Sequence, residues 1–149
     1  MLRDDINKDL TEAQKAKNER AVSTLRMVNS TLKNADIEAR TTGKPLGDPE
    51  VLAILQKMIK QRQESVEMYK KGDRPDLVKQ EEEEIAIISV YLPKQMSEAE
   101  VAAAIDAAIA ETGAGSMKDM GKVIGVLRAK FAGQMDFGKA SGAVKAKLQ

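Results

Sequence analysis

The sequence contains no cysteine, no histidine and no tryptophan, and only 3% of its residues are aromatic. Without Cys and His, the chain cannot form disulfides, zinc–thiolate sites, cysteine nucleophiles or histidine-based acid–base centres. The low aromatic content argues against a β-sandwich and against an RNA module that stacks bases on aromatic rings. These absences favour an all-α protein and fit a reducing compartment.

The sequence also lacks any targeting or membrane-spanning pattern. Residues 1–5 include acidic side chains where a signal peptide would carry an apolar run. No apolar run approaches the length needed to cross a bilayer. Because 42% of the residues are hydrophobic and 32% are charged, the chain can still build a core. We therefore expect a soluble cytoplasmic protein of one domain or two small ones.

Charge is distributed unevenly along the chain, although the formal net charge is only +1. Residues 1–47 carry a net charge of +2, residues 48–112 carry −6 and residues 113–149 carry +5. The C-terminal part is thus a basic module that follows an acidic body. A basic module supplies the nonspecific attraction to phosphates that nucleic-acid binding needs, although charge alone also fits a solvated helical face.

Apolar residues recur at helical spacing throughout the chain, and no alternating strand pattern and no internal repeat is evident. The expected helices cover residues 2–16, 20–39, 48–71, 73–91, 97–111, 116–132 and 137–148. Asp48, Ser97 and Asp136 are the expected N-caps of three of them. We predict an N-terminal domain of about four helices at residues 1–92, a linker at 93–96 and a three-helix tail domain at 97–149.

Four consecutive glutamates, residues 81–84, precede an apolar half-helix. Neighbouring helical residues point in different directions, so the four carboxylates cannot converge on one divalent cation, and we expect no metal site. A solvated helical face explains most of the run. Because Glu81 and Glu84 share a face with apolar residues, we expect at least one carboxylate to point inward, toward Lys57, Lys60 or Arg62.

The most unusual stretch is residues 116–128. Ser116 and Asp119 have nearly the spacing of a capping box, which predicts a helix start. Gly121 and Gly125 lie four apart on one face, and each costs about 1 kcal/mol relative to Ala in a helix. Another helix or a sugar–phosphate chain must therefore approach the backbone closely. The same segment carries three cations, Lys118, Lys122 and Arg128.

No catalytic centre is apparent. A P-loop needs Gly-x-x-x-x-Gly-Lys-Ser/Thr after a strand, and neither that spacing nor a strand accompanies Gly121-Lys122. The many acidic residues lack the apolar surroundings that would tune a carboxyl group for acid–base work. We expect no catalytic residues and no cofactor.

Several motifs match a known family. In the tail they are Ser116-x-Lys118-Asp119, Met120-Gly121-Lys122-Val123-Ile124-Gly125-x-Leu127, Gly133-x-x-Asp136 and Val144-x-x-x-Leu148. Upstream they are Lys57-x-x-Lys60-Gln61-Arg62-x-Glu64-Ser65 and Glu81-x-x-Glu84 before Tyr91-Leu92-Pro93. The combination resembles the GatB/YqeY family over nearly the whole chain, and in particular its free-standing YqeY-like members. One departure is Asp136-Phe137-Gly138, where family members often carry Asp-Gly.

The resemblance implies an all-α protein with an N-terminal helical domain and a three-helix tail. In the tRNA-dependent amidotransferase the related tail contacts tRNA, while other domains perform kinase and amidase chemistry. Those domains do not fit in this chain, and the Ser-Ser-Lys type of amidase centre is absent. The resemblance thus implies a non-catalytic tRNA-binding module or accessory factor. Its RNA-binding residues would be Lys118, Gly121, Lys122, Gly125, Arg128, Lys139 and Lys145.

Two other functions stay open at this point. The chain could be a protein-interaction adaptor of an amidotransferase or an aminoacyl-tRNA synthetase. It could also contribute to a glutamine-dependent carbon–nitrogen ligase that needs partner subunits, an activity that the family label would carry over from the larger enzyme.

Overall fold

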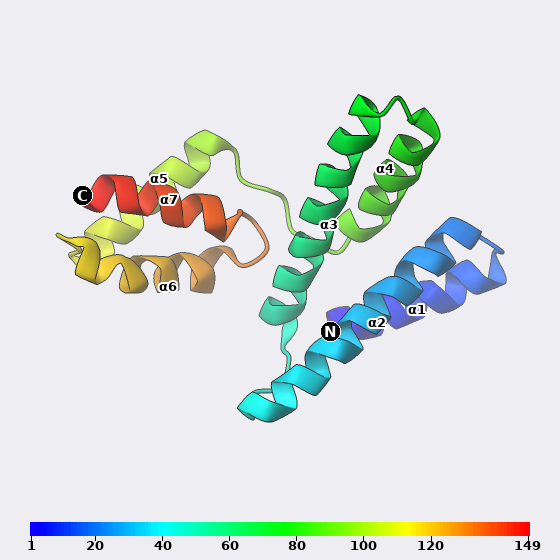
Figure 1. Ribbon diagram of the computed structural model, residues 1–149. Helices are drawn as coiled ribbons and strands as arrows, with labels where there is room; N and C mark the ends of the chain where they lie inside the picture. The colour runs from blue at the N-terminus through cyan, green and yellow to red at the C-terminus, as the bar shows by residue number, and fades with distance from the viewer. The chain divides into compact units, whose positions relative to one another are not determined.

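The structure is a computed structural model that describes residues 1–149. It contains seven α-helices, one short 3₁₀ turn and no strand, which confirms the all-α prediction (Figure 1). The chain divides into two compact units, Met1–Leu92 and Pro93–Gln149. The predicted domain limits, residues 1–92 and 97–149 with a linker at 93–96, stay a prediction.

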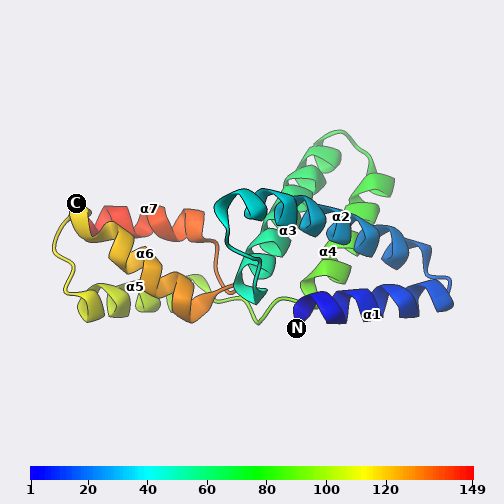
Figure 2. The same ribbon diagram turned by 90° about the horizontal axis from the view of Figure 1, so that it is seen from below.

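The first unit consists of two helical hairpins, which Figures 1 and 2 both show. The first hairpin pairs α1 (Leu2–Lys15) with α2 (Glu19–Thr42), and the second pairs α3 (Asp48–Lys71) with α4 (Pro75–Ser89). Helices α2 and α4 bring the hairpins together. The core between them contains Ile6, Leu25, Val28, Leu32, Val51, Leu55, Met58, Ile59 and Ile88.

The second unit is a three-helix arrangement of α5 (Glu98–Thr112), α6 (Met120–Phe131) and α7 (Phe137–Leu148), with the 3₁₀ turn η1 (Met117–Asp119) before α6. Each of the three helices packs on the other two. Helices α6 and α7 run in opposite directions (Figures 1 and 2). The core residues are Ala104, Ile105, Ala108, Val123, Leu127, Met135, Ala140, Val144 and Leu148.

Two of the expected N-caps are present. The Ser97 hydroxyl accepts a hydrogen bond from the Glu100 N–H, and the Glu100 carboxylate accepts one from the Ser97 N–H. Asp136 Oδ1 accepts hydrogen bonds from the N–H groups of Gly138 and Lys139 at 2.9 and 3.3 Å. Both helices therefore begin where the sequence predicts, because these caps satisfy amide groups that the helix itself leaves unpaired.

Two other expected caps are wrong. The N-cap of α3 is Gly47, and the Asp48 carboxylate instead accepts a hydrogen bond from the N–H of Leu2 on α1. The Ser116 side chain forms no capping hydrogen bond, and the segment after it is the 3₁₀ turn η1 rather than the first turn of α6. In both places a partner distant in sequence or a tighter turn replaces the local cap that the spacing suggests.

Part of the expected linker belongs to the second unit. The Met96 N–H donates to the Gln134 carbonyl at 2.9 Å, and the Gln95 side-chain amide donates to the Gly133 carbonyl at 2.6 Å. Met96 also packs against the core of this unit. The segment before α5 is therefore held against the loop between α6 and α7.

Candidate nucleic-acid interface

The outer face of α6 consists of small residues between two cations. Val123 and Leu127 are buried, whereas Gly121 and Gly125 lie on the exposed side of the same helix. On a helical wheel of 100° per residue, these two glycines lie nearly opposite the buried pair. Lys122 and Arg128 occupy the two edges of that exposed face. The sequence prediction that the glycines share a face with cations beside them is consistent with this geometry.

The two glycines serve no packing contact within the second unit. A Cβ atom added at either Gly121 or Gly125 would meet no other heavy atom within 4 Å. The view that they let the last helix pack closely on α6 is therefore wrong. Glycine weakens an exposed helix by about 1 kcal/mol relative to alanine, and nothing inside the molecule compensates for that cost. A close approach by a sugar–phosphate chain, the other explanation that the sequence offers, stays a prediction.

The cations predicted to bind RNA are all exposed. Lys118, Lys139 and Lys145 take part in no ion pair. The amine of Lys122 lies 4.0 Å from Asp119, and the lysine side chain remains 72% exposed. The Arg128 guanidinium lies 5.5 Å from the ring centroid of Phe137 on α7, which orients it without neutralising its charge. All five cations can therefore reach an external anion.

Two lysines that were not predicted as site residues have a different role. Lys130 Nζ lies 2.6 Å from Glu111 Oε2, and Lys147 forms an ion pair with Asp106. Both acids belong to α5, so these lysines neutralise part of the acidic helix rather than an external ligand. The sequence offers no local signal for this division, because it depends on which helix lies beside each lysine.

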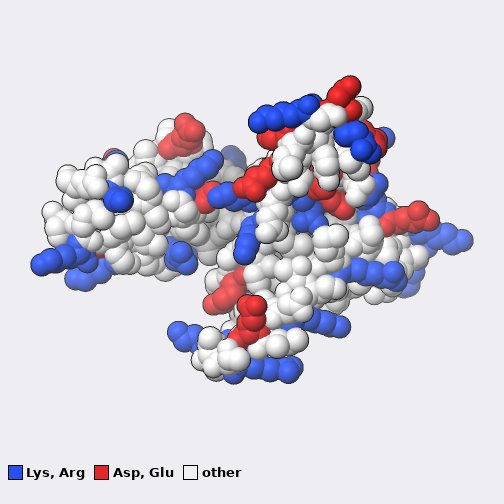
Figure 3. All heavy atoms as spheres, in the orientation of Figure 1, with Lys and Arg blue, Asp and Glu red and all other residues white.

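The amide groups at the start of α7 cannot hold an anion. Asp136 already accepts hydrogen bonds from two of them. Before α6, Asp119 Oδ2 accepts a hydrogen bond from the Gly115 N–H at 3.1 Å, and its carboxylate adds negative charge there. An anionic ligand therefore has to bind through side chains on the helix faces. In Figure 3 the visible face of this unit is largely uncharged, with Lys and Arg side chains mostly around its edges and an acidic side chain at its upper edge.

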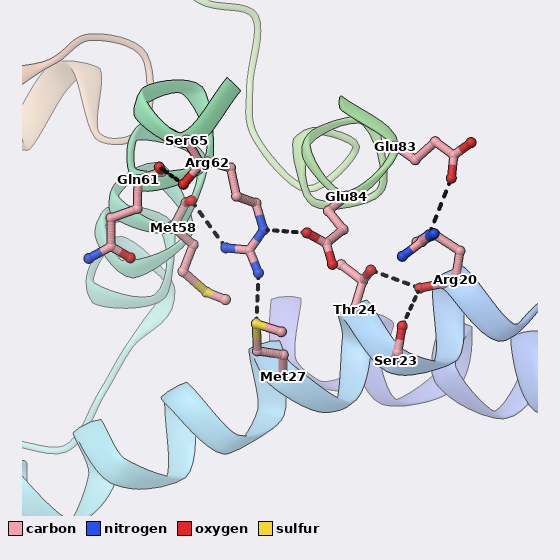
Figure 4. A network of polar contacts seen from close by, with 10 residues as sticks. All are labelled: Arg20, Ser23, Thr24, Met27, Met58, Gln61, Arg62, Ser65, Glu83 and Glu84. Carbon is pink, nitrogen blue, oxygen red and sulfur yellow. Dashed lines mark hydrogen bonds and ion pairs between the residues drawn. The ribbon is translucent and has the colours of Figure 1, made fainter. Parts of the chain in front are cut away.

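The glutamate run in the first unit behaves differently from a solvated face. Glu84 is buried, and its Oε2 lies 3.4 Å from Nε of buried Arg62 on α3 (Figure 4). The same guanidinium donates to the Met58 carbonyl at 3.2 Å and to the Met27 sulfur at 2.7 Å. The prediction that one carboxylate points inward toward a basic residue of the preceding helix is confirmed.

The neighbouring carboxylates complete this polar network. Glu83 Oε2 accepts a hydrogen bond from Arg20 Nε on α2 at 3.2 Å (Figure 4). Burial raises the pKa of Glu81, and the nearby negative charge of Glu84 raises it further. The network thus ties α2, α3 and α4 together. Its members are engaged with one another and line no cavity that would hold a substrate.

Two hollows lie at helix turns of the first unit, apart from the glutamate network and from the predicted site residues. One, of about 330 Å³, lies at the turn between α3 and α4 beside Tyr69, Arg74 and Lys79. Another, of about 430 Å³, lies near the turn between α1 and α2 beside Lys17 and Arg26. Both are open to solvent, and neither contains a predicted site residue. No group of three acidic side chains is arranged to hold a metal ion, and none of the helices could cross a membrane.

Comparison with known proteins identifies the family. The model of the Yqey-like protein family matches residues 3–148. The chain belongs to this family. The resemblance that the tail and glutamate motifs suggested is therefore confirmed over almost the full length of the chain.

Curated relatives of this Yqey-like chain come from fungi. Altered inheritance of mitochondria protein 41, mitochondrial, of Lachancea thermotolerans is 38% identical over 108 residues, which cover 71% of this chain and 57% of that protein. The protein of the same name from Eremothecium gossypii is 36% identical, over 71% of this chain and 58% of its own length. An uncharacterized protein of Schizosaccharomyces pombe is 32% identical, over 62% of this chain and 72% of its own. The chain thus spans little more than half the length of the first two relatives.

Proposed function

We propose that this Yqey-like protein is a non-catalytic RNA-binding accessory factor whose second unit binds the sugar–phosphate backbone of tRNA. The observation that carries the proposal is the set of exposed cations and glycines on η1, α6 and α7. Lys118, Lys139 and Lys145 are exposed without ion-pair partners, and Gly121 and Gly125 leave the helix backbone open to close approach. Cations supply affinity for phosphates, and glycine removes the side chain that would keep a phosphate chain away.

The proposal predicts a strong dependence of binding on salt. Each neutralised phosphate adds about 0.7 to 0.9 to the slope of log affinity against log salt concentration. We expect Lys118→Glu combined with Lys122→Glu to lower that slope by roughly two units and to weaken tRNA binding, because two phosphate contacts are lost. Fluorescence anisotropy with labelled tRNA over a range of salt concentrations measures both quantities.

The matched control is Lys33→Glu combined with Lys44→Glu in the first unit. These lysines are exposed as well, and the substitution changes the net charge by the same amount. The control should keep the wild-type slope if the site is local. A tail variant with wild-type affinity, or a wild-type protein that does not bind tRNA at low salt, would refute the proposal.

A protein-interaction adaptor is the second candidate. The open glycines on α6 favour it as well, because a partner's helix can approach small residues closely. Binding to an amidotransferase or an aminoacyl-tRNA synthetase that is unaffected by Lys118→Glu and by salt would support the adaptor. A role in glutamine-dependent carbon–nitrogen ligation would then come from partner subunits, and the isolated protein should not amidate a misacylated tRNA.

The compartment is part of the same proposal. We expect this chain to act in the cytoplasm, although two of the relatives above are named as mitochondrial proteins. Fractionation of the native host, with detection of the tagged protein, tests this expectation directly.

A further inference from the structure

Helices α6 and α7 share a short sequence pattern, called here two copies, although no internal repeat was expected in the chain. Residues 119–131 read DMGKVIGVLRAKF, and residues 136–148 read DFGKASGAVKAKL. Aligned without gaps at an offset of 17 residues, the copies share six identical positions and a cation at one more. The identical pairs are Asp119/Asp136, Gly121/Gly138, Lys122/Lys139, Gly125/Gly142, Ala129/Ala146 and Lys130/Lys147.

The shared positions lie outside the core, and the core positions differ. In each copy the shared glycines, the alanine and both lysines are exposed. The buried pairs are not identical: Val123 corresponds to Ala140, and Leu127 corresponds to Val144. If packing alone explained the similarity, the buried residues would be the identical ones, because buried positions are the most sensitive to side-chain volume. The two copies therefore share a surface rather than a core.

One pair of equivalent lysines also has equivalent partners in the structure, whereas Asp119 and Asp136 bind different amide groups. Lys130 and Lys147 both form ion pairs with acids of α5. The remaining cations, Lys122 with Arg128 in the first copy and Lys139 with Lys145 in the second, form no ion pair with α5. A Cβ atom added at Gly125 or at its counterpart Gly142 meets no atom within 4 Å. Each copy thus pairs one lysine with an acid of α5 and leaves two cations without an α5 partner.

The arrangement of the copies indicates the form of the ligand. The two copies are antiparallel (Figures 1 and 2), so a rotation of about 180° would place one approximately on the other. The two backbones of a nucleic-acid duplex are also antiparallel and are related by local two-fold axes, so protein symmetry can match duplex symmetry. Two packed helices measure about 20 Å across, including side chains. That width suits contacts to both strands across the wide, shallow minor groove of A-form RNA.

We propose that α6 and α7 form a pair of equivalent contacts to double-stranded RNA, with one helix on each strand. Lys122 and Arg128 would contact the backbone of one strand, and Lys139 and Lys145 that of the other. This inference rests on the proposed RNA-binding function and sharpens it, because it assigns the ligand to duplex stems rather than to single-stranded loops.

The test compares the same substitution in the two copies. Lys122→Glu and Lys139→Glu replace identical, exposed residues at equivalent positions. Binding is measured to an RNA hairpin with a stem of about 16 base pairs and to an unstructured single strand of the same number of nucleotides. We expect each variant to bind the hairpin about three- to tenfold more weakly, with a salt slope lower by about one unit. The double variant should lose about two units, and the wild type should prefer the hairpin.

Several outcomes would overturn the inference. If one variant loses affinity and the other binds as the wild type does, the copies are not equivalent contacts. Equal affinity of the wild type for both RNAs would exclude duplex recognition but leave RNA binding itself intact. A wild-type protein that binds neither RNA would refute the proposed function as well, and the face would then belong to a protein partner. Thermal melting by circular dichroism establishes that each variant remains folded.

Discussion

The two units of this Yqey-like protein use charged side chains in opposite ways. In the first unit, the four-glutamate run is engaged inside the molecule: Glu84 with Arg62, and Glu83 with Arg20. Acidic and basic side chains lie close together over the turn between α3 and α4 (Figure 3). In the second unit, Lys130 and Lys147 neutralise α5, and the other cations of α6 and α7 stay available. A cluster of charged residues therefore indicates a binding function only once the ion pairs that these residues form within the molecule are known.

Breaking the buried ion pair tests whether the charges of the first unit stabilise the fold, and it should give the largest change in the free energy of unfolding. Glu84→Ala leaves the Arg62 guanidinium buried without its counter-charge. Removing one partner of a buried pair typically costs about 3–5 kcal/mol of unfolding free energy. Chemical denaturation with urea measures this loss.

The double substitution Arg62→Met with Glu84→Leu is the matched control for that experiment. It removes both charges and fills the same space with apolar side chains. Such replacements are often neutral or stabilising, so we expect stability close to that of the wild type. A double variant as unstable as Glu84→Ala would mean that the ion pair itself, rather than the uncompensated charge, determines the effect.

Two serines at the expected helix starts allow a smaller and equally direct comparison. Ser97→Ala removes an N-cap with a reciprocal Glu100 contact and should cost about 1 kcal/mol. Ser116→Ala should change the free energy of unfolding by only a few tenths of a kcal/mol, because its side chain caps nothing. Equal losses for the two variants would contradict the 3₁₀ start that the structure gives to the segment before α6.

These serines also illustrate how far sequence reasoning reaches. Periodicity and local caps such as Ser97 and Asp136 predicted the helical class and most helix positions, because those signals lie within a few residues of one another. The failures at Asp48 and Ser116 have a common reason. Asp48 binds the N–H of Leu2, 46 residues away, and a tighter turn follows Ser116. Neither competitor is visible in a local spacing rule.

The candidate site shows the same limit. The sequence predicted that Gly121 and Gly125 share a face with cations, since helical geometry fixes that relation. It could not decide whether that face packs on another helix of the chain, because the answer depends on the rotation of α6 against its neighbours. To predict that Lys130 pairs with an acid of α5, one likewise needs the three-dimensional arrangement of the helices.

The glycine face gives a small expected gain in stability and the most specific test of whether the exposed side of α6 binds a ligand. Gly125→Ala should raise the free energy of unfolding by about 0.5–1 kcal/mol, because alanine is the better helix former and its methyl group meets nothing. Gly43→Ala, the same change at a φ of +72°, should instead destabilise the protein. At position 125, the substitutions should weaken tRNA binding although alanine stabilises the fold. The added methyl group, and still more the longer side chain of Gly125→Gln, would hold an RNA backbone away from the helix. A variant that is more stable than the wild type yet binds tRNA more weakly can only be explained by a partner on this face. If Gly125→Gln binds tRNA with wild-type affinity, the cations of α6 act without close approach to the backbone, and the glycines need another explanation.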